Sequence, residues 1–169
     1  MKIALEKNSK VLLAEIRQLD LEVFGSTDLS YNWYLENYNS IEEVVVARSN
    51  KKLAGYCLIT GIDNLVFEGI NAGVFSGDYS FSSRAYKPLK ESNKYYLASI
   101  AVDKKYKGQG IGKELIGLSL TNLYKFNKQH EVVSIAVSLD GGKILGRNGF
   151  GRLLSLKTDG SERHIMLKR

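Results

Sequence analysis

The sequence has few of the residues that cross-link a chain or interrupt its regular structure. It contains one cysteine, one proline and two histidines in 169 residues. One cysteine excludes a disulfide framework and a zinc site built from thiolates, and it fits a reducing cytosol. The single proline and a hydrophobic content of 44% predict one globular domain over residues 1–169, with a substantial core.

Long hydrophobic runs are also absent. The first twenty residues, MKIALEKNSKVLLAEIRQLD, interrupt their apolar positions with charged side chains such as Glu6, Lys10 and Arg17. We therefore expect neither a signal peptide nor a membrane span, and a cytoplasmic location. Lysine and arginine outnumber aspartate and glutamate by 24 to 18, a net charge of +6. That charge suits a phosphate-rich ligand, an acidic acceptor or RNA, and does not choose between them.

Helix and strand signals alternate along the chain and predict an α/β protein. Ser9 caps a first helix that ends at Gly25, and a second, aromatic helix runs from residue 28 or 30 to Tyr38. Later segments are predicted as strands at 44–47, 53–62 and 131–139, a short helix at 141–148, and a closing hairpin at 151–169 that turns at 158–160.

Residues 63–94 are the least regular part of the chain. Residues 64–70 fit either a strand or a short helix, and Pro88 interrupts any regular element that would run through it. Glycines and serines near residues 73–83 suggest loops. The stretch is therefore expected to be a binding loop, or else an additional pair of a helix and a strand.

The stretch Tyr95–Gly117, YYLASIAVDKKYKGQGIGKELIG, reads as a strand, a glycine loop and an amphipathic helix. Glycines let the backbone approach a ligand closely, and the N–H groups at a helix start bind anions. The stretch therefore predicts a phosphate cradle. It matches neither G-x-x-x-x-G-K-[ST] nor a convincing dinucleotide fingerprint, because Gly112 comes one position too early for the latter.

The same residues resemble a known acyl-CoA-binding motif. The runs Ser99–Asp103 and Tyr106–Lys113, followed by Leu115-Ile116, are similar to the motif [RQ]-x-x-G-x-[GA] of the GNAT acetyltransferase superfamily. In this register Lys107 takes the [RQ] position, and Gly110 and Gly112 are the two glycines. Gly55-Tyr56 in the predicted hairpin and Gly149-Phe150 near the end agree with the same family, so the resemblance covers the chain apart from residues 63–94.

The resemblance implies a mixed, mostly antiparallel sheet of six or seven strands, flanked by helices and with splayed central strands, in an α/β (α+β) fold. It also implies acetyl-CoA as co-substrate and no metal. Backbone N–H groups from Gln109 to Gly112 would hold the pyrophosphate, and the pantetheine arm would pair with the backbone of Ile100 and Val102. The full set of implied CoA-binding residues is Ile100, Ala101, Val102, Lys107, Gly108, Gln109, Gly110, Ile111, Gly112 and Lys113.

The acid that protonates the leaving thiolate is less clear from the sequence. Many family members use a tyrosine, but alignment through Gly149-Phe150 places Leu145 at that position, and leucine has no proton to donate. Three explanations remain open: another group acts as acid, the thiolate leaves by way of water, or the protein binds acyl-CoA without efficient catalysis. The predicted catalytic residues are Ser138, which replaces the customary asparagine, and Tyr96, with Tyr95 and Tyr106 as further candidates.

A general base is not evident in the sequence either. Candidates by location alone are Glu68, Asp78, Asp103 and Asp140, each of which also fits an ordinary surface charge. The two histidines, at positions 130 and 164, are expected to have structural roles.

The function implied by the resemblance is transfer of an acetyl group from acetyl-CoA to a primary amine of a small molecule or peptide. Residues 63–94, the aromatic helix and the tail are expected to shape the acceptor pocket. A non-catalytic acyl-CoA-binding module is one alternative. A toxin-type acetyltransferase acting on aminoacyl-tRNA is another, since the net charge permits nucleic acid as a partner without favouring it. The sequence is compatible with a homodimer and does not decide the oligomeric state.

Overall fold

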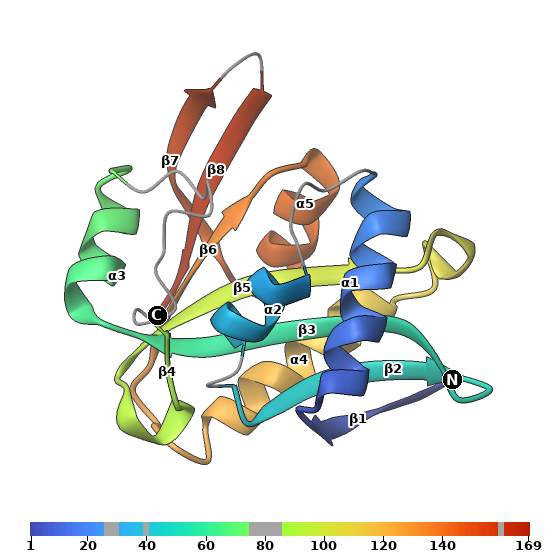
Figure 1. The fold of residues 1–169 in the computed structure, drawn as a ribbon. Helices are drawn as coiled ribbons and strands as arrows, with labels where there is room; N and C mark the ends of the chain where they lie inside the picture. Colours follow the sequence, from blue (N-terminus) through green and yellow to red (C-terminus); the bar gives the residue numbers. More distant parts are fainter. Residues whose placement is uncertain (26–30, 39–40, 75–85, 159–160) are drawn as a thin grey trace.

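The computed structural model describes residues 1–25, 31–38, 41–74, 86–158 and 161–169 (Figure 1). The elements, in chain order, are β1 (Lys2–Lys7), α1 (Lys10–Phe24), α2 (Tyr31–Tyr38), β2 (Glu43–Ser49), β3 (Lys52–Ile62), α3 (Asn64–Asn71), β4 (Tyr86–Lys87), η2 (Leu89–Glu91), β5 (Lys94–Val102), η3 (Lys104–Tyr106), α4 (Ile111–Leu123), β6 (Glu131–Ala136), α5 (Leu139–Arg147), β7 (Gly151–Thr158) and β8 (Ser161–Lys168).

The strands form one mixed sheet in the order β1-β2-β3-β5-β6-β8-β7, and the two-residue β4 pairs with β3 outside this path. Among the strands that the structure describes, β5 and β6 run parallel, and the other pairs of neighbours are antiparallel. The predicted mixed, mostly antiparallel sheet is confirmed, with seven strands on the path and β4 as an eighth. Strand β1 was not predicted from the sequence: its inner residues are all half-buried, so that neither face gives a strong alternation signal.

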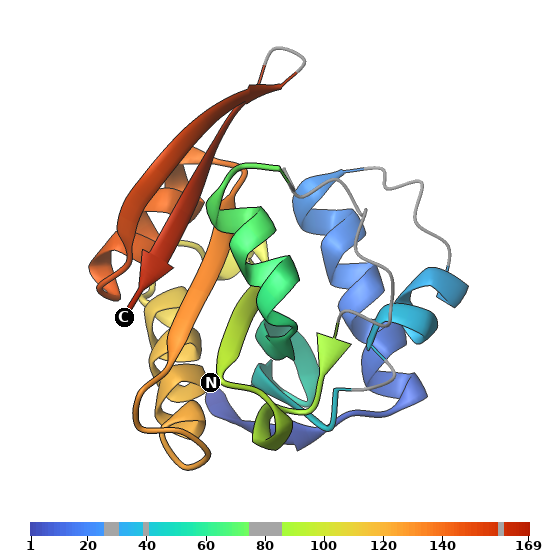
Figure 2. The same cartoon turned by 90° about the vertical axis from the view of Figure 1, so that its left-hand side faces the viewer.

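Helices cover both faces of the sheet. The helices α1, α2 and α3 lie on one face, and α4 and α5 lie on the other, as the two perpendicular views show (Figures 1 and 2). The core accordingly has separate apolar layers: Leu115 and Leu123 of α4 belong to one of them, while Ile16 of α1 and Tyr34 of α2 belong to another. Strand β5 lies between the two layers, so that both reach its side chains.

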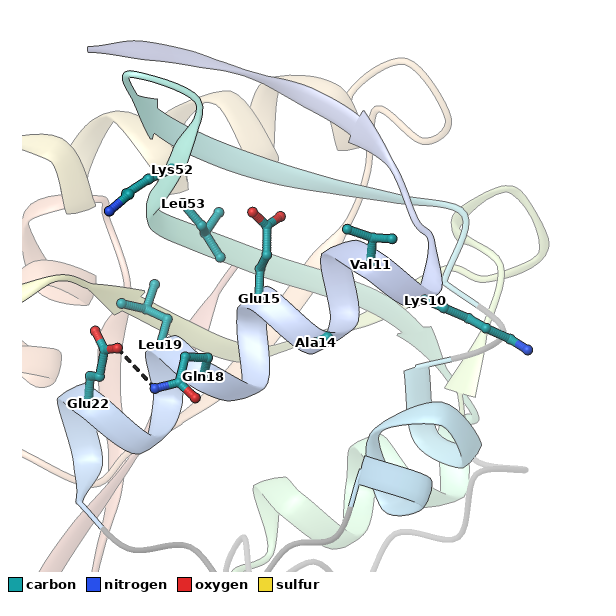
Figure 3. A pocket seen from close by; sticks show the side chains of 9 residues that line it. All are labelled: Lys10, Val11, Ala14, Glu15, Gln18, Leu19, Glu22, Lys52 and Leu53. Carbon is teal, nitrogen blue, oxygen red and sulfur yellow. Dashed lines mark hydrogen bonds between the residues drawn. The ribbon is translucent and has the colours of Figure 1, made fainter.

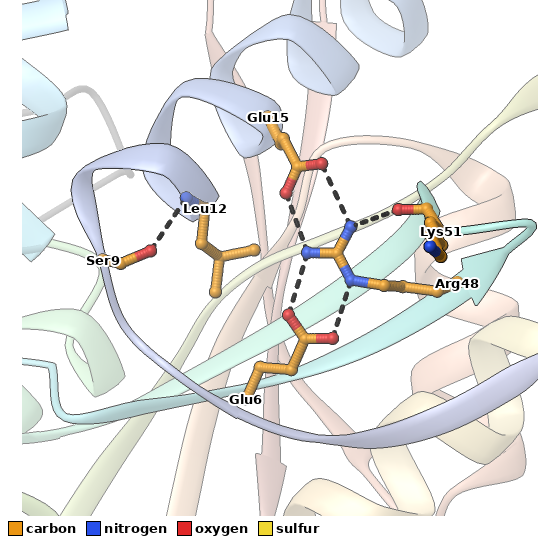
Figure 4. A network of polar contacts seen from close by, with 6 residues as sticks. All are labelled: Glu6, Ser9, Leu12, Glu15, Arg48 and Lys51. Carbon is orange, nitrogen blue, oxygen red and sulfur yellow. Dashed lines mark hydrogen bonds and ion pairs between the residues drawn. The ribbon is translucent and has the colours of Figure 1, made fainter.

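Helix α1 is fixed to the sheet by Arg48 of β2, which binds two carboxylates (Figure 4). Its Nε and Nη2 atoms donate to the two carboxylate oxygens of Glu6 at 2.7 and 2.8 Å, and Nη1 and Nη2 donate to those of Glu15 at 3.0 and 2.8 Å. Nη1 also donates to the carbonyl oxygen of Lys51 at 2.9 Å. The hydrogen bonds from Arg48 hold the pKa of Glu6 below its usual range. This network joins β1, α1 and β2, and it sets the position of α1 across the sheet.

Residues 63–94 contain a helix and a short strand, which is the second of the two alternatives predicted for them. Residues 64–70 fall within α3, where Phe67 and Ile70 are buried against the sheet. Pro88 precedes the single turn η2. The predicted loop around Asp78 lies outside the described residues, as does the tip of the predicted closing hairpin at 159–160.

The closing hairpin of β7 and β8 extends away from the rest of the sheet (Figure 1). Within the described ranges, no helix has both the length and the apolar character needed to cross a bilayer.

Candidate active site

The sheet opens between its two parallel strands. The pairing of β5 with β6 ends where Leu97 lies opposite Ser134, although β5 continues to Val102 and β6 to Ala136. The buried hydroxyl of Ser134 donates to the carbonyl oxygen of Leu97 at 3.0 Å and closes the base of this fork. Beyond it the two strands diverge, which confirms the predicted splayed central strands.

A β-bulge in β5 lies beside the fork. Leu58 of β3 pairs with Ser99 and Ile59 pairs with Leu97, so Ala98 is an extra residue in β5. The bulge changes which face the following side chains occupy: Ala101 joins the layer beneath α1, while Ile100 and Val102 contact the layer beneath α4. It also brings the Ser99 hydroxyl to the α1 side, 2.6 Å from the hydroxyl of Tyr56.

The glycine loop between β5 and α4 has the backbone geometry that its sequence predicts. Gly108 and Gly110 have φ angles of +82° and +81°, and Gly110 is the N-cap of α4. A β-carbon at either position would meet open space, so it is the backbone conformation that requires glycine. Gly112 differs, because a β-carbon there would lie 3.3 Å from Cδ1 of Ile144. The lack of a side chain at this position lets α4 lie close to α5.

Lys107 connects this loop to α5. Its ammonium group forms an ion pair with Oδ2 of Asp140 at 2.6 Å, on the surface. The hydrogen bond from Lys107 holds the pKa of the Asp140 carboxyl below its usual range. The other polar side chains predicted for the cradle, Gln109 and Lys113, are exposed. The loop and the start of α5 therefore face each other across the opening of the fork.

A pocket of about 370 Å³ follows the fork into the molecule. It contains the predicted residues Ile100, Tyr96 and Ser138, whereas Tyr95 and Tyr106 do not line it. Tyr95 instead donates its hydroxyl to the carbonyl oxygen of Ser92 at 2.6 Å. The lining residues are Asp20, Phe24, Tyr34, Tyr38, Tyr96, Leu97, Ala98, Ser99, Ile100, Ser134, Ile135, Ala136, Val137, Ser138, Gly141, Leu145 and Arg163.

Three of these residues belong to the α5 region, where the family's acid is expected: Ser138, Gly141 and Leu145. Ser138 is the N-cap of α5, and its hydroxyl oxygen accepts a hydrogen bond from the N–H of Gly141 at 3.1 Å. This leaves the Ser138 proton available for donation toward the pocket. Leu145 is buried, with 2% of its surface exposed, and packs into the core beneath α4. An apolar side chain thus occupies the position of the missing tyrosine.

Sequence reasoning missed a buried carboxylate in the pocket wall. Asp20 of α1 is 6% exposed, and it accepts hydrogen bonds from the hydroxyls of Tyr56 at 2.7 Å and Tyr34 at 2.9 Å. Burial raises its pKa to about 6, against the opposing effect of the two tyrosine hydrogen bonds. The signal was present in the sequence, because Asp20 follows the buried Ile16 by four residues and so belongs to the apolar face of the helix.

The other candidate bases lie elsewhere. Glu68 is exposed on α3, and Asp103 caps the turn η3 by accepting from the N–H of Lys105 at 3.0 Å. Both histidines are buried: Nδ1 of His164 is 2.9 Å from the hydroxyl of Ser155, and Nδ1 of His130 is 3.1 Å from the carbonyl oxygen of Asn127. None of these four residues lines the pocket. In the part of the chain that the structure describes, no three His, Cys, Asp or Glu side chains gather to hold a metal ion.

A second hollow, of about 610 Å³, runs along α1 beside the start of β3 (Figure 3). Charged and apolar side chains alternate along it, and Gln18 donates to Glu22 across one turn of the helix at 3.0 Å. None of its residues belongs to the glycine loop or the fork. This hollow therefore shares no residue with the pocket that contains the predicted site residues. The residues of this hollow are Lys10, Val11, Ala14, Glu15, Gln18, Leu19, Glu22, Lys52 and Leu53.

The loop, the fork and the sheet order together define a GNAT fold. The sequence pattern of the acetyltransferase (GNAT) family matches residues 13–143, which is most of the chain. The protein therefore belongs to the GNAT acetyltransferase family, and the predicted membership is confirmed.

Solved structures of acetyltransferases have the same fold at low sequence identity. The ribosomal-protein-S18-alanine N-acetyltransferase from Escherichia coli matches with a TM-score of 0.67 and 15% identity, over 98% of this chain and 92% of that one. Ard1 from Thermoplasma volcanium gives 0.69 and 12%, over 99% and 97%. A chain of the NatC complex bound to Gag peptide and CoA gives 0.64 and 15%, over 99% and 98%. No curated protein sequence is similar enough to count as a relative.

Proposed function

We propose that this protein is an N-acetyltransferase that moves an acetyl group from acetyl-CoA to a primary amine. One observation carries the proposal: the fork between β5 and β6 leads from a positive-φ glycine loop at a helix N-terminus into a pocket lined by hydroxyls and a carboxylate. A phosphate-bearing donor with a long, amide-containing arm and a small amine acceptor would meet in such an arrangement.

The residues present fit coenzyme A. Open space above Gly108 and Gly110 gives an anion access to the N–H groups at the start of α4, where the helix dipole favours negative charge. Lys107, which is exposed, can exchange Asp140 for a phosphate. The backbone of β5 beyond Leu97 has lost its partner strand β6, and it offers amide groups to the amides of the pantetheine arm.

When bound, acetyl-CoA supplies the activated acetyl thioester. The side chains and backbone of this protein would position the thioester, and its hydroxyl groups would supply the proton that the leaving sulfur needs. The Ser138 hydroxyl, whose oxygen accepts from Gly141, can donate its proton toward the sulfur at the end of the fork. Tyr96 adds a second hydroxyl-bearing side chain to the same pocket. Leu145 supplies no proton and excludes water from this side.

The acceptor end of the pocket suits an amine on a compact, partly apolar group. Tyr34 and Tyr38 of α2 and Phe24 of α1 form an aromatic wall beside Asp20. The acceptor would be a small molecule or a peptide N-terminus. The latter is the kind of acceptor suggested by the names of the structurally similar ribosomal-protein-S18-alanine N-acetyltransferase and the peptide-bound NatC complex. The single buried, free thiol of Cys57 suits a reducing, cytoplasmic compartment.

Calorimetry with CoA and acetyl-CoA tests the donor site. Wild-type protein should bind both, and Gly110→Glu should abolish binding, because it places a side chain and a negative charge in the cradle. Gly117→Glu is the matched control: it introduces the same residue on the same helix, at a glycine with open space around it and nearly two turns from the loop. Equal CoA affinity in folded Gly110→Glu and Gly117→Glu would remove the basis of the proposal. Gly112→Glu is also expected to prevent binding, but contact with Ile144 makes it the less clean variant.

The missing tyrosine at Leu145 gives weight to a second candidate function, a non-catalytic acyl-CoA-binding module. A steady-state assay of CoA release with a panel of small amines, peptides and an aminoacyl-tRNA separates the two. Amine-dependent turnover supports the transferase. Tight CoA binding with no turnover on any member of the panel supports the binding module.

A further inference from the structure

We propose that Ser99, Tyr56 and Asp20 form a proton relay that removes a proton from the acceptor amine. This inference rests on the proposed N-acetyltransferase function and adds the base that the sequence did not reveal. Ser99 would contact the amine, and Asp20 would receive the proton through the two hydroxyls.

The three groups form a continuous chain of short hydrogen bonds from the fork into the protein. Ser99 lies in the pocket lining two residues beyond the end of the β5–β6 pairing, and it is only half-buried. Its Oγ lies 2.6 Å from the hydroxyl of the fully buried Tyr56, which lies 2.7 Å from Oδ1 of Asp20. The bulge at Ala98 is what brings Ser99 to this side of β5.

The direction of these hydrogen bonds follows from the carboxylate. An ionised carboxylate only accepts, so Tyr56 gives its single proton to Asp20. The Tyr56 oxygen then accepts from Ser99, and an Oγ lone pair of Ser99 remains for an N–H donor in the pocket. Once Asp20 is protonated, every bond in the chain can reverse. A proton relay requires a chain of hydrogen bonds in which each hydroxyl can exchange its donor and acceptor roles in this way.

Asp20 has surroundings suited to a base that works near neutral pH. Two titratable groups donate to it, Tyr34 of α2 and Tyr56 of β3. The others in the same pocket are Tyr38 of α2, Tyr96 of β5 and Arg163 of β8. Burial raises the pKa of Tyr56 and of Tyr38 well above the usual tyrosine value, so neither hydroxyl ionises near neutral pH. Burial also raises the pKa of Asp20 to about 6. The carboxyl is therefore mostly ionised, and yet basic enough to accept a proton, at pH 7.

The proton transfers balance without an oxidant or reductant. An ammonium N–H bond breaks, and its electron pair stays on nitrogen. A new O–H bond forms on Ser99, whose former proton passes to Tyr56, and the Tyr56 proton passes to Asp20. The nitrogen pair forms the bond to the acetyl carbon as the carbon–sulfur bond breaks. The second proton lost by nitrogen replaces the proton that Ser138 gives to the departing sulfur, and Asp20 releases its proton to solvent.

The test measures kcat against pH at saturating amine, with the best acceptor from the panel. Wild-type kcat should rise with pH through a midpoint near 6, because ionised Asp20 is the active form. This rise is the acidic limb of the pH profile. Asp20→Asn, Tyr56→Phe and Ser99→Ala should each lower kcat by about 100-fold or more and lose this limb. Tyr34→Phe removes a donor to the same carboxylate without breaking the chain, so it should keep the limb and move it to higher pH. Tyr86→Phe, at a buried tyrosine that does not line the pocket, is the control and should match wild type.

Two readouts are independent of turnover. The side-chain carboxyl carbon of Asp20, followed by NMR without ligands, should titrate near pH 6 in wild type and higher in Tyr56→Phe. CoA affinity should be unchanged in Ser99→Ala, a substitution that removes only a hydroxyl.

The outcomes separate the two proposals. If CoA binds but wild type acetylates no amine, the proposed function fails and the relay fails with it. If amines are acetylated and Ser99→Ala or Asp20→Asn keeps the wild-type rate and pH profile, the relay alone is overturned. Titration of Asp20 near its ordinary value would also overturn it. Loss of the limb in the three relay variants, with Tyr86→Phe unchanged, would support it.

Discussion

Removing the charge of Asp20 should change how the stability of the protein depends on pH. Burial raises the pKa of this carboxyl from 3.8 to about 6 on folding. The folded state therefore binds the proton more tightly than the unfolded state does, so protonation of Asp20 stabilises the folded state. This contribution to the free energy of unfolding is fully present below about pH 3.8 and is lost as the pH rises through about 6. Since one pKa unit corresponds to about 1.4 kcal/mol, ionised Asp20 makes the folded protein about 3 kcal/mol less stable than protonated Asp20 does.

The assay is urea unfolding of wild type and Asp20→Asn, followed by circular dichroism at about pH 5 and about pH 7.5. Between these values the difference in unfolding free energy, wild type minus variant, should fall by about 1.4 kcal/mol. Other carboxyl groups titrate equally in both proteins and cancel. Any fixed effect of the amide on the tyrosine hydrogen bonds is the same at both pH values and cancels as well.

Asp140→Asn serves as the control for this measurement. It removes an exposed carboxyl whose pKa lies below its usual range, so the corresponding difference should not change between the two pH values. A wild-type minus Asp20→Asn difference that stays constant would show that Asp20 is not held at a raised pKa, and the reasoning about its burial would be wrong.

Three further expectations follow from contacts described above. Arg48→Ala should lower the free energy of unfolding by about 1–2 kcal/mol. Arg48→Lys should recover little of this loss, since a lysine ammonium lacks the planar set of N–H donors that binds Glu6 and Glu15 together. A lysine variant as stable as wild type would contradict this. Cys57, whose pKa burial raises to about 12, should react with a thiol reagent at about pH 8 only after the protein is unfolded in urea, and rapid labelling of the native protein would refute its burial. Lys107→Gln should weaken CoA binding several-fold in low salt and less in high salt, whereas the exposed Lys125→Gln should not; equal affinities for the two variants would remove Lys107 from the site.

The parts of the site that were predicted from sequence are local in the chain. The glycine loop depends on a few consecutive residues, so its glycines at positions 108, 110 and 112 are already visible as a pattern that follows a strand and precedes a helix. The mixed, mostly antiparallel sheet with splayed central strands followed from the family resemblance carried by that pattern. The helix at Ser9 was likewise signalled by its cap, and the Ser9 hydroxyl accepts from the N–H of Leu12.

The part that was missed is assembled from distant segments. Asp20, Tyr34, Tyr56 and Ser99 come from four different elements, and the bonds between them join residues 14 to 43 positions apart. No local sequence pattern predicts such a cluster. A carboxylate on the apolar face of a predicted helix is a sign that a partner must exist, but it does not say which residue the fold brings to it. The strand β1 was missed because an edge strand whose inner residues are all half-buried shows little burial contrast.

The fork between β5 and β6 also makes ligand binding detectable by hydrogen–deuterium exchange of the β5 amides. One edge of β5 is paired with β3 as far as Val102, whereas the other loses β6 after Leu97. In hydrogen–deuterium exchange, the amides of residues 98–102 that point toward β3 should be protected, and those that point into the fork should exchange quickly. A bound arm that pairs with the open edge would slow only the second group. A single strand would then record, amide by amide, whether the fork is filled.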